Sequence, residues 1–123
     1  LITDEILNNI DISDYKVGVI HLHIMHTSAS LTINENADST VREDMESYFN
    51  KFVPENEPYY KHTFEGSDDM PAHIKSSLLG NSVSLPIKDG SLNLGTWQGI
   101  FLCEHRNHLQ QRKITVTING DKN

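Results

Sequence analysis

The segment from Lys16 to Met25 reads KVGVIHLHIM, and the rest of the architecture is best worked out from it. β-branched and other apolar residues dominate it at both odd and even positions, which is typical of a strand covered on both faces. We therefore expect a central strand over residues 16–25. A second strand is expected from Ala29 to Ile33, directly after a short polar segment that begins at His26.

The segment from Asp38 to Phe52 predicts the longest helix. Its apolar residues recur at helical spacing and form one stripe: Val41, Met45, Tyr48, Phe49 and Phe52. An amphipathic helix of this kind is expected to bury its stripe against the strands.

Two shorter helices are expected on either side. Asp68 or Asp69 can cap a helix over residues 71–79, with Pro71 in its first turn and Gly80 at its end. Its apolar residues are Ile74, Leu78 and Leu79. Near the start of the chain, residues 3–10 predict a helix with the Thr3 hydroxyl as its cap.

The remaining patterns complete the predicted fold class. Strands are expected at residues 82–87, at 91–106 with a break near Gly95, and at 112–119, while residues 54–70 form a long loop. Strands and helices do not alternate regularly, so an α+β domain is favoured over a doubly wound sheet. The length of 123 residues predicts one domain.

Charge and cysteine content exclude several classes of partner. The chain has 10 Lys and Arg against 17 Asp and Glu, a formal net charge of -7, and this surface repels nucleic acid and anionic membranes. No apolar stretch approaches the roughly 20 residues of a membrane span. The lone Cys103 cannot form an internal disulfide and is expected to be a buried strand thiol, which indicates a cytoplasmic protein. The sequence begins at Leu1 without a charged and then apolar leader, so we expect either no signal peptide or a chain whose start is missing.

Seven histidines are an excess for a chain of this length. His26, His62 and His73 lie on a strand end, a loop and a helix, and three such residues can form the three-ligand site of a catalytic zinc. Separate surface or core histidines are the alternative. His21 and His23 share one face of a strand, where they can bind a metal or simply be hydrogen-bonded.

Three blocks of sequence resemble the YjbQ family. They are HTSASLTINEN at residues 26–36, DDMPAHIKSSLLG at 68–80 and LGTWQGI at 94–100, and the similarity runs from Leu1 to Gly120. The resemblance implies a single α+β domain over residues 1–123, with a β-sandwich-like core of mostly antiparallel strands and two main helices. It also implies a homotrimer, and a further N-terminal strand that we expect to be missing from this sequence.

The resemblance also implies a function. The family is described as a secondary thiamine-phosphate synthase, a transferase, so a small phosphorylated substrate is expected. Matched by position, His26, His62 and His73 become the metal ligands, and the resemblance weakens His105 as a ligand. The expected cofactor is a divalent metal, with zinc favoured and magnesium as the alternative.

Other residues of these blocks are candidates for the site. Glu35, Asp44 and Gln98 are candidate catalytic residues, although Glu35 can equally cap backbone amides and Asp44 can be a solvated acid. The remaining candidates are expected to bind substrate, as a flat wall or as the charge that meets a phosphate: Asn34, Thr96, Trp97, Arg106 and Arg112.

Three functions remain open from the sequence. The first is a metal-dependent enzyme acting on a small phosphorylated heteroaromatic compound. The second is a non-catalytic module that binds a metal or an anion. The third is metal-assisted hydrolysis, in which Glu35 or Asp44 activates water.

Overall fold

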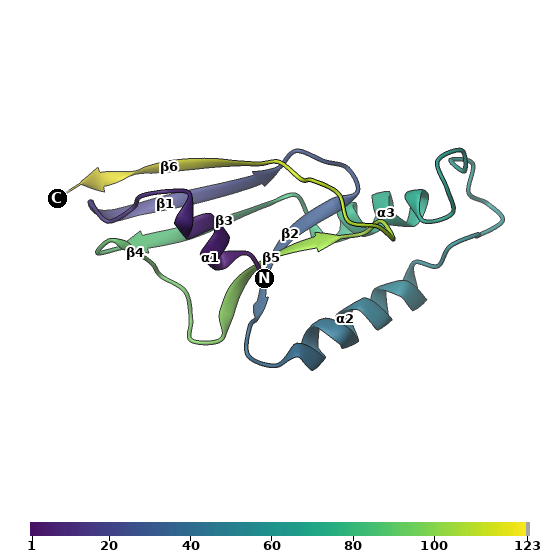
Figure 1. Cartoon of the computed structure of the whole chain (residues 1–123), viewed down its shortest axis with the longest axis horizontal. Coiled ribbons are helices and arrows are strands. Elements are labelled where there is room, and N and C mark those ends of the chain that lie inside the picture. Colours follow the sequence, from purple (N-terminus) through teal and green to yellow (C-terminus); the bar gives the residue numbers. More distant parts are fainter. Residues whose placement is uncertain (123) are drawn as a thin grey trace.

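The computed structural model describes residues 1–122 and shows a mixed α+β chain (Figure 1). The helices are α1 (Thr3–Asn8), α2 (Ser39–Phe52) and α3 (Asp69–Leu79). The strands are β1 (Tyr15–Ile24), β2 (Ala29–Glu35), β3 (Ser82–Lys88), β4 (Ser91–Leu92), β5 (Gln98–Glu104) and β6 (Ile114–Lys122). The predicted α+β class is confirmed.

The strands form two antiparallel sheets. The larger has the order β4-β3-β1-β6, and β2 pairs with β5 in the smaller. Ile20 of β1 lies opposite Leu85 of β3 and Ile118 of β6. One apolar core cluster joins both sheets and α1, and it includes Leu31 of β2 and Ile100 of β5. In Figure 1 the β2–β5 pair extends from the larger sheet toward α3.

Strand β1 is covered on one face only, so the prediction that both faces are covered is wrong. Ile20, Leu22 and Ile24 are buried, whereas Val17 and Val19 are about half exposed. Successive side chains of a strand point to opposite faces, and only one face of this sheet meets the core. His21 lies on the other face, where its Nδ1 is 2.9 Å from the hydroxyl of Ser84.

Helix α2 forms as predicted, but none of its residues is fully buried. The Asp38 carboxylate caps it by accepting a hydrogen bond from the Thr40 backbone N–H at 2.9 Å. No residue of α2 is buried, and Tyr48 and Phe52 of the predicted stripe are largely exposed. Figure 1 shows α2 running apart from the larger sheet. The expectation that its apolar stripe packs into the core is therefore wrong.

Helix α3 begins at Asp69, two residues earlier than predicted, and Gly80 caps its end with φ of 99°. Its buried residues are Asp69, Pro71, Ala72, Lys75 and Ser76, whereas Leu78 of the predicted stripe is exposed. The Ser76 hydroxyl donates to the carbonyl of Ala29 at 2.8 Å, so α3 lies close against β2. A close approach of this kind requires small side chains rather than leucines.

One detail near the N-terminus differs from the sequence interpretation, and one between β4 and β5 agrees with it. The Thr3 hydroxyl does not cap α1, because its oxygen accepts a hydrogen bond from the backbone N–H of Ile100. Between β4 and β5, the Gln98 side chain accepts from the Gly95 N–H at 2.8 Å, which is the predicted break. Within residues 1–122, no helix is both long and apolar enough to cross a membrane.

Candidate metal centre

Three side chains meet where the loop over residues 53–68 joins α3. Asp69 is the first residue of α3, His73 follows one turn later, and His62 comes from the loop. The i, i+4 spacing places Asp69 and His73 on one face of the helix. The loop then brings His62 against both of them.

The three groups converge on one carboxylate oxygen. Oδ2 of Asp69 is 2.8 Å from Nε2 of His62 and 3.1 Å from Nε2 of His73. One potential ligand atom from each residue lies within 4.8 Å of the others. The Asp69 side chain is only 3% exposed, whereas His62 is half exposed. Two imidazole nitrogens and one carboxylate oxygen form a donor set that zinc accepts.

Both ring nitrogens of His73 face oxygens that can only accept. Its Nδ1 lies 2.9 Å from the carbonyl oxygen of Thr27, and its Nε2 lies 3.1 Å from Oδ2 of Asp69. A neutral ring has one N–H, so it leaves one lone pair against an oxygen, and with the proton on Nδ1 this is the lone pair of Nε2 against Asp69. A second proton or a metal ion between these two atoms removes that repulsion. A ligating histidine commonly donates its other N–H to a backbone carbonyl in this way.

Arg106 pairs with Asp69 of the centre and with its neighbour Asp68. Its guanidinium donates to Oδ1 of Asp69 at 2.9 Å and to Oδ2 of Asp68 at 2.9 Å. The hydrogen bonds from Arg106 and from the Asn107 N–H lower the pKa of Asp68 to about 2. Burial raises the pKa of Asp69, but His62, His73 and Arg106 outweigh it, and the net shift is downward. Both carboxylates are therefore ionised at neutral pH.

His26 does not join the group formed by His62, Asp69 and His73. Its Nε2 accepts a hydrogen bond from the backbone N–H of Lys113 at 2.8 Å, which leaves Nδ1–H as its free donor. His26 and His73 nevertheless line the same open cavity of about 300 Å³. The other lining residues are Thr27, Ser76, Ser77, Gly80 and Asn81. Of the three histidines expected to converge, the structure thus brings two together and places the third at a neighbouring wall.

Neither predicted phosphate-facing arginine is free. Arg106 is paired with Asp68 and Asp69, as described above. Arg112 is 4% exposed and pairs with Glu104, with 2.7 Å between its Nε and Oε1. The interpretation of these two side chains as phosphate ligands is corrected accordingly, because each is occupied by carboxylates.

The other predicted substrate-binding residues lie apart from the three-residue centre. Thr96 and Trp97 are exposed in the turn before β5, and neither lines the cavity beside His73. Asn34 accepts a hydrogen bond from the Glu35 N–H and lines a different cavity under α2. The expected wall of Asn34, Thr96 and Trp97 is therefore not assembled at the histidines.

The predicted catalytic residues are also separate from the centre. Glu35 ends β2, Asp44 lies exposed on α2, and the side-chain oxygen of Gln98 is bonded to Gly95. None of them belongs to the group of possible metal ligands or lines the cavity beside His73. The structure supplies Asp69 instead. The sequence carried a signal for it, because Asp69 and His73 stand four residues apart at the start of a predicted helix.

Two known proteins are similar in sequence to nearly the whole chain. The YjbQ protein of Salmonella typhimurium is 56% identical over 98% of this chain and 88% of its own length. The YjbQ protein of Escherichia coli O157:H7 is 54% identical with the same coverage. None of these names states a reaction.

Solved structures of related proteins have a similar fold. A YjbQ/UPF0047-family protein of Clostridium acetobutylicum has a TM-score of 0.79 and 36% identity, over 96% of this chain and 88% of its own. A conserved hypothetical protein of Thermus thermophilus has a TM-score of 0.79 and 31% identity, over 96% of this chain and 86% of its own. The family model described as UPF0047 protein YjbQ-like matches residues 1–121, and the chain belongs to this family.

Proposed function

We propose that the protein binds a divalent metal, zinc before magnesium, through His62, Asp69 and His73, and acts with it on a small phosphorylated substrate. The observation that carries the proposal is the buried Asp69 oxygen between two imidazole nitrogens, of which that of His73 belongs to a ring with acceptor oxygens at both nitrogens. Nitrogen ligands favour zinc over magnesium, which prefers oxygen. The metal would supply positive charge that stabilises a departing or attacked phosphate oxygen.

The residues around the centre suit an oxyanion beside the metal. The Nδ1–H of His26 is a donor without a partner among residues 1–122, and His26 lines the same cavity as His73. Thr27 and Ser77 add small polar side chains to this cavity. A phosphoryl group in the cavity would meet His26 while its other end stays in solvent. The thiamine-phosphate synthase activity implied by the resemblance is one reaction of this class, since pyrophosphate leaves during it.

Metal content and turnover test the proposal together. Untagged protein should contain about one zinc per chain by elemental analysis, and a chelator should remove both metal and activity. The assay mixes a hydroxymethylpyrimidine pyrophosphate with a thiazole phosphate and measures thiamine phosphate. Protein that stays free of metal after incubation with zinc would refute the metal centre. Metal without turnover would leave the binding module as its function.

A second candidate role is structural, and the pairing of Arg106 supports it. Arg106 connects Asp68 and Asp69 of the helix start with the carbonyl of Glu65 in the loop. With His62 also on Asp69, the group fastens the loop to α3 without any metal. In this case, loss of His62 would loosen the loop and change proteolysis there, whereas added zinc would have no effect.

We also propose that the protein assembles as a closed trimer. Strand β6 is an edge of the larger sheet. Val17 and Val19 of the neighbouring strand β1 are about half exposed on the outer face of the same sheet. Unpaired edges and exposed apolar side chains favour association. Light scattering should give three times the mass of the chain at micromolar concentration, and a monomer mass would contradict the proposal.

A further inference from the structure

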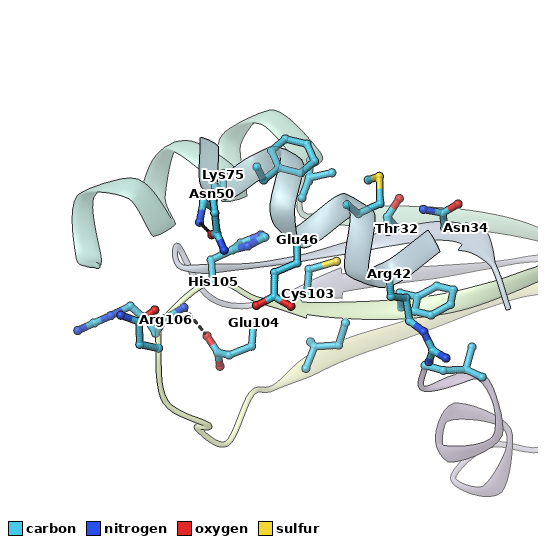
Figure 2. Close-up of a pocket in the computed structure, with 17 residues that line it drawn as sticks. Thr32, Asn34, Arg42, Glu46, Asn50, Lys75, Cys103, Glu104, His105 and Arg106 are labelled. Atoms are coloured by element: carbon cyan, nitrogen blue, oxygen red, sulfur yellow. Dashed lines mark hydrogen bonds between the residues drawn. The ribbon is translucent and has the colours of Figure 1, made fainter. Parts of the chain in front are cut away.

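A cavity of about 340 Å³ lies between α2 and the smaller sheet, apart from the proposed metal cavity. Figure 2 shows Lys75, Asn50 and His105 at one of its ends and Thr32, Asn34 and Arg42 at the other. This volume lies near the lower end of the range for sites of small organic ligands.

The sheet face under α2 carries polar side chains as well as apolar ones. Along β2, Leu31 belongs to the apolar core, whereas its neighbour Thr32 and the next residue of the same face, Asn34, line the cavity. Above them, α2 has no buried residue. Phe101 of β5 lies opposite Thr32 and also lines the cavity, so the face is mixed, and the space between it and α2 has room for a small ligand.

Lys75 is the unusual group in the wall. It is 9% exposed, and its ammonium donates to the Asn50 side chain at 2.8 Å. It makes no ion pair with any carboxylate of residues 1–122. Burial lowers the pKa of Lys75, and the charges of Glu55 and Glu46 offset this only in part. An ammonium has three donors, and a buried charge that no carboxylate contacts is costly. An anion in the cavity would supply that contact.

His105 stands beside Lys75 as a neutral partner. Its Nε2 is 2.8 Å from the buried hydroxyl of Ser30. Burial, reinforced by the charge of Lys75, lowers the pKa of His105 to about 4, so the ring carries no charge at neutral pH. Its other nitrogen can therefore exchange a hydrogen bond with a ligand and leave Lys75 as the charge at this end.

The other charges of the wall leave a positive balance. Arg106 is paired with Asp68 and Asp69, and Glu104 is paired with Arg112. Arg42 and Lys75 then face the single acid Glu46, which is exposed on α2. The apolar lining is partly aromatic and consists of Met45, Phe49, Leu79, Phe101 and Leu102, with Leu1.

We propose that this cavity binds a small aromatic anion, a carboxylate or a phosphate ester, whose charged group contacts Lys75 and Asn50 and whose ring lies against Phe49 and Phe101. The volume admits one ring with one charged substituent. The site does not depend on the metal, although Arg106 contacts Asp69 and also lines this cavity.

Calorimetry on chelator-treated protein tests the site with three probes of similar size. Phenyl phosphate and benzoate carry the anion, and benzyl alcohol is the neutral control. We expect one anion to bind with a Kd of about 1 mM or tighter and benzyl alcohol at least about tenfold more weakly. Tighter phenyl phosphate identifies a phosphate ester as the ligand class, and tighter benzoate a carboxylate. Equal affinity for all three probes would overturn the proposal.

Matched variants then locate the binding. Lys75→Met should weaken the anion at least about tenfold, because a charge-assisted hydrogen bond is lost. Lys51→Met, an exposed lysine on α2, should leave affinity unchanged. Unchanged affinity in folded Lys75→Met would overturn the proposal. If this variant does not fold, amide shifts of the native protein decide: the largest shifts must fall on Asn50, Cys103 and His105, and shifts elsewhere refute the site.

A metal-site variant separates the two proposals. His62→Ala should bind the aromatic anion as tightly as the native chain, whatever it does to zinc, because His62 does not line this cavity. A chain that binds no zinc can therefore still bind the aromatic anion, and a chain that binds no aromatic anion can still bind zinc, so the two proposals fail separately.

Discussion

Nε2 of His73 lies 3.1 Å from Oδ2 of Asp69, one turn earlier on α3, while Nδ1 of the same ring points to the carbonyl of Thr27. Both neighbours of the ring are oxygen atoms that only accept hydrogen bonds. The ring is therefore satisfied either as an imidazolium or as a neutral ligand of a cation. Which cation the ring binds separates the two proposed roles of the centre. A protonated His73 suits the structural role, in which the group holds the loop against α3, and a metal-bound His73 suits the metal-dependent activity.

Asp69→Asn should separate these roles. The amide keeps the shape of the side chain but removes the negative charge that would hold the metal. We expect the affinity for zinc to fall by about 100-fold or more, since even residues that only support ligands cost roughly 10- to 100-fold. Competition with a coloured chelator measures the affinity. Asp44→Asn on the exposed face of α2 is the control, and equal zinc affinity in both variants would rule out Asp69 as a ligand.

Asp68 should stabilise the fold at neutral pH and lose this effect as the pH falls into the acid range. The hydrogen bond from Arg106 lowers its pKa to about 2 in the folded chain, below the value in the unfolded chain. A lowered carboxyl pKa adds stability that is present above the unfolded pKa and is lost as the pH falls through the folded one. We expect Asp68→Asn to cost about 1 to 2 kcal/mol at pH 6, a figure reduced from the full pKa difference for partial exposure.

Urea unfolding of both proteins between pH 6 and pH 2 measures this effect. The free energies of unfolding of native protein and Asp68→Asn should converge toward pH 2. A constant gap across this range would show that the carboxylate charge of Asp68 plays no part.

Arg112→Ala tests the corrected role of Arg112. The side chain is buried, pairs with Glu104 and donates to the hydroxyl of Ser28 at 3.0 Å. Its removal leaves the Glu104 carboxylate without its partner, and we expect a loss of about 3 kcal/mol in the free energy of unfolding. Adding Glu104→Gln should recover part of that loss. Zinc affinity should not change, and a stable single variant with a raised KM would restore the phosphate-binding interpretation.

Much of the architecture can be predicted from the sequence, because local patterns determine it. The helical spacing from Val41 to Phe52 and the Pro71 and Gly80 signals locate α2 and α3 to within two residues. Burial is harder to predict. The same spacing predicts a buried stripe on α2, yet Tyr48 is exposed, because spacing reports which residues share a face and not what covers that face.

The candidate site shows the same division. Residue type and resemblance identify His62 and His73, and the structure places them together. For Asp69 the sequence predicts only a possible helix cap, because its contact with His62 depends on the path of the loop over 53–68, which has no periodicity. His26 is predicted to join them, but its pairing with the Lys113 N–H joins residues 87 apart and leaves no local trace.

His105 makes the stability of the protein depend on pH between neutral and about pH 4. Burial, together with the charge of Lys75, lowers its pKa to about 4, so the folded chain holds the neutral ring. A histidine with a lowered pKa contributes its full stability above the unfolded pKa and loses it as the pH falls toward the folded value. We expect the free energy of unfolding of the native protein to fall by about 1 to 2 kcal/mol between pH 7 and pH 5 through this residue.

His105→Gln keeps a polar partner for Ser30 and does not titrate, so its free energy of unfolding should fall less over the same range. Urea unfolding at pH 7, 6 and 5 compares the two proteins, which share every other titrating group. If the free energies of unfolding of the two proteins fell in parallel, His105 would take up its proton equally well in the folded and unfolded chains. That result would contradict a neutral His105 ring beside Lys75 in the folded protein.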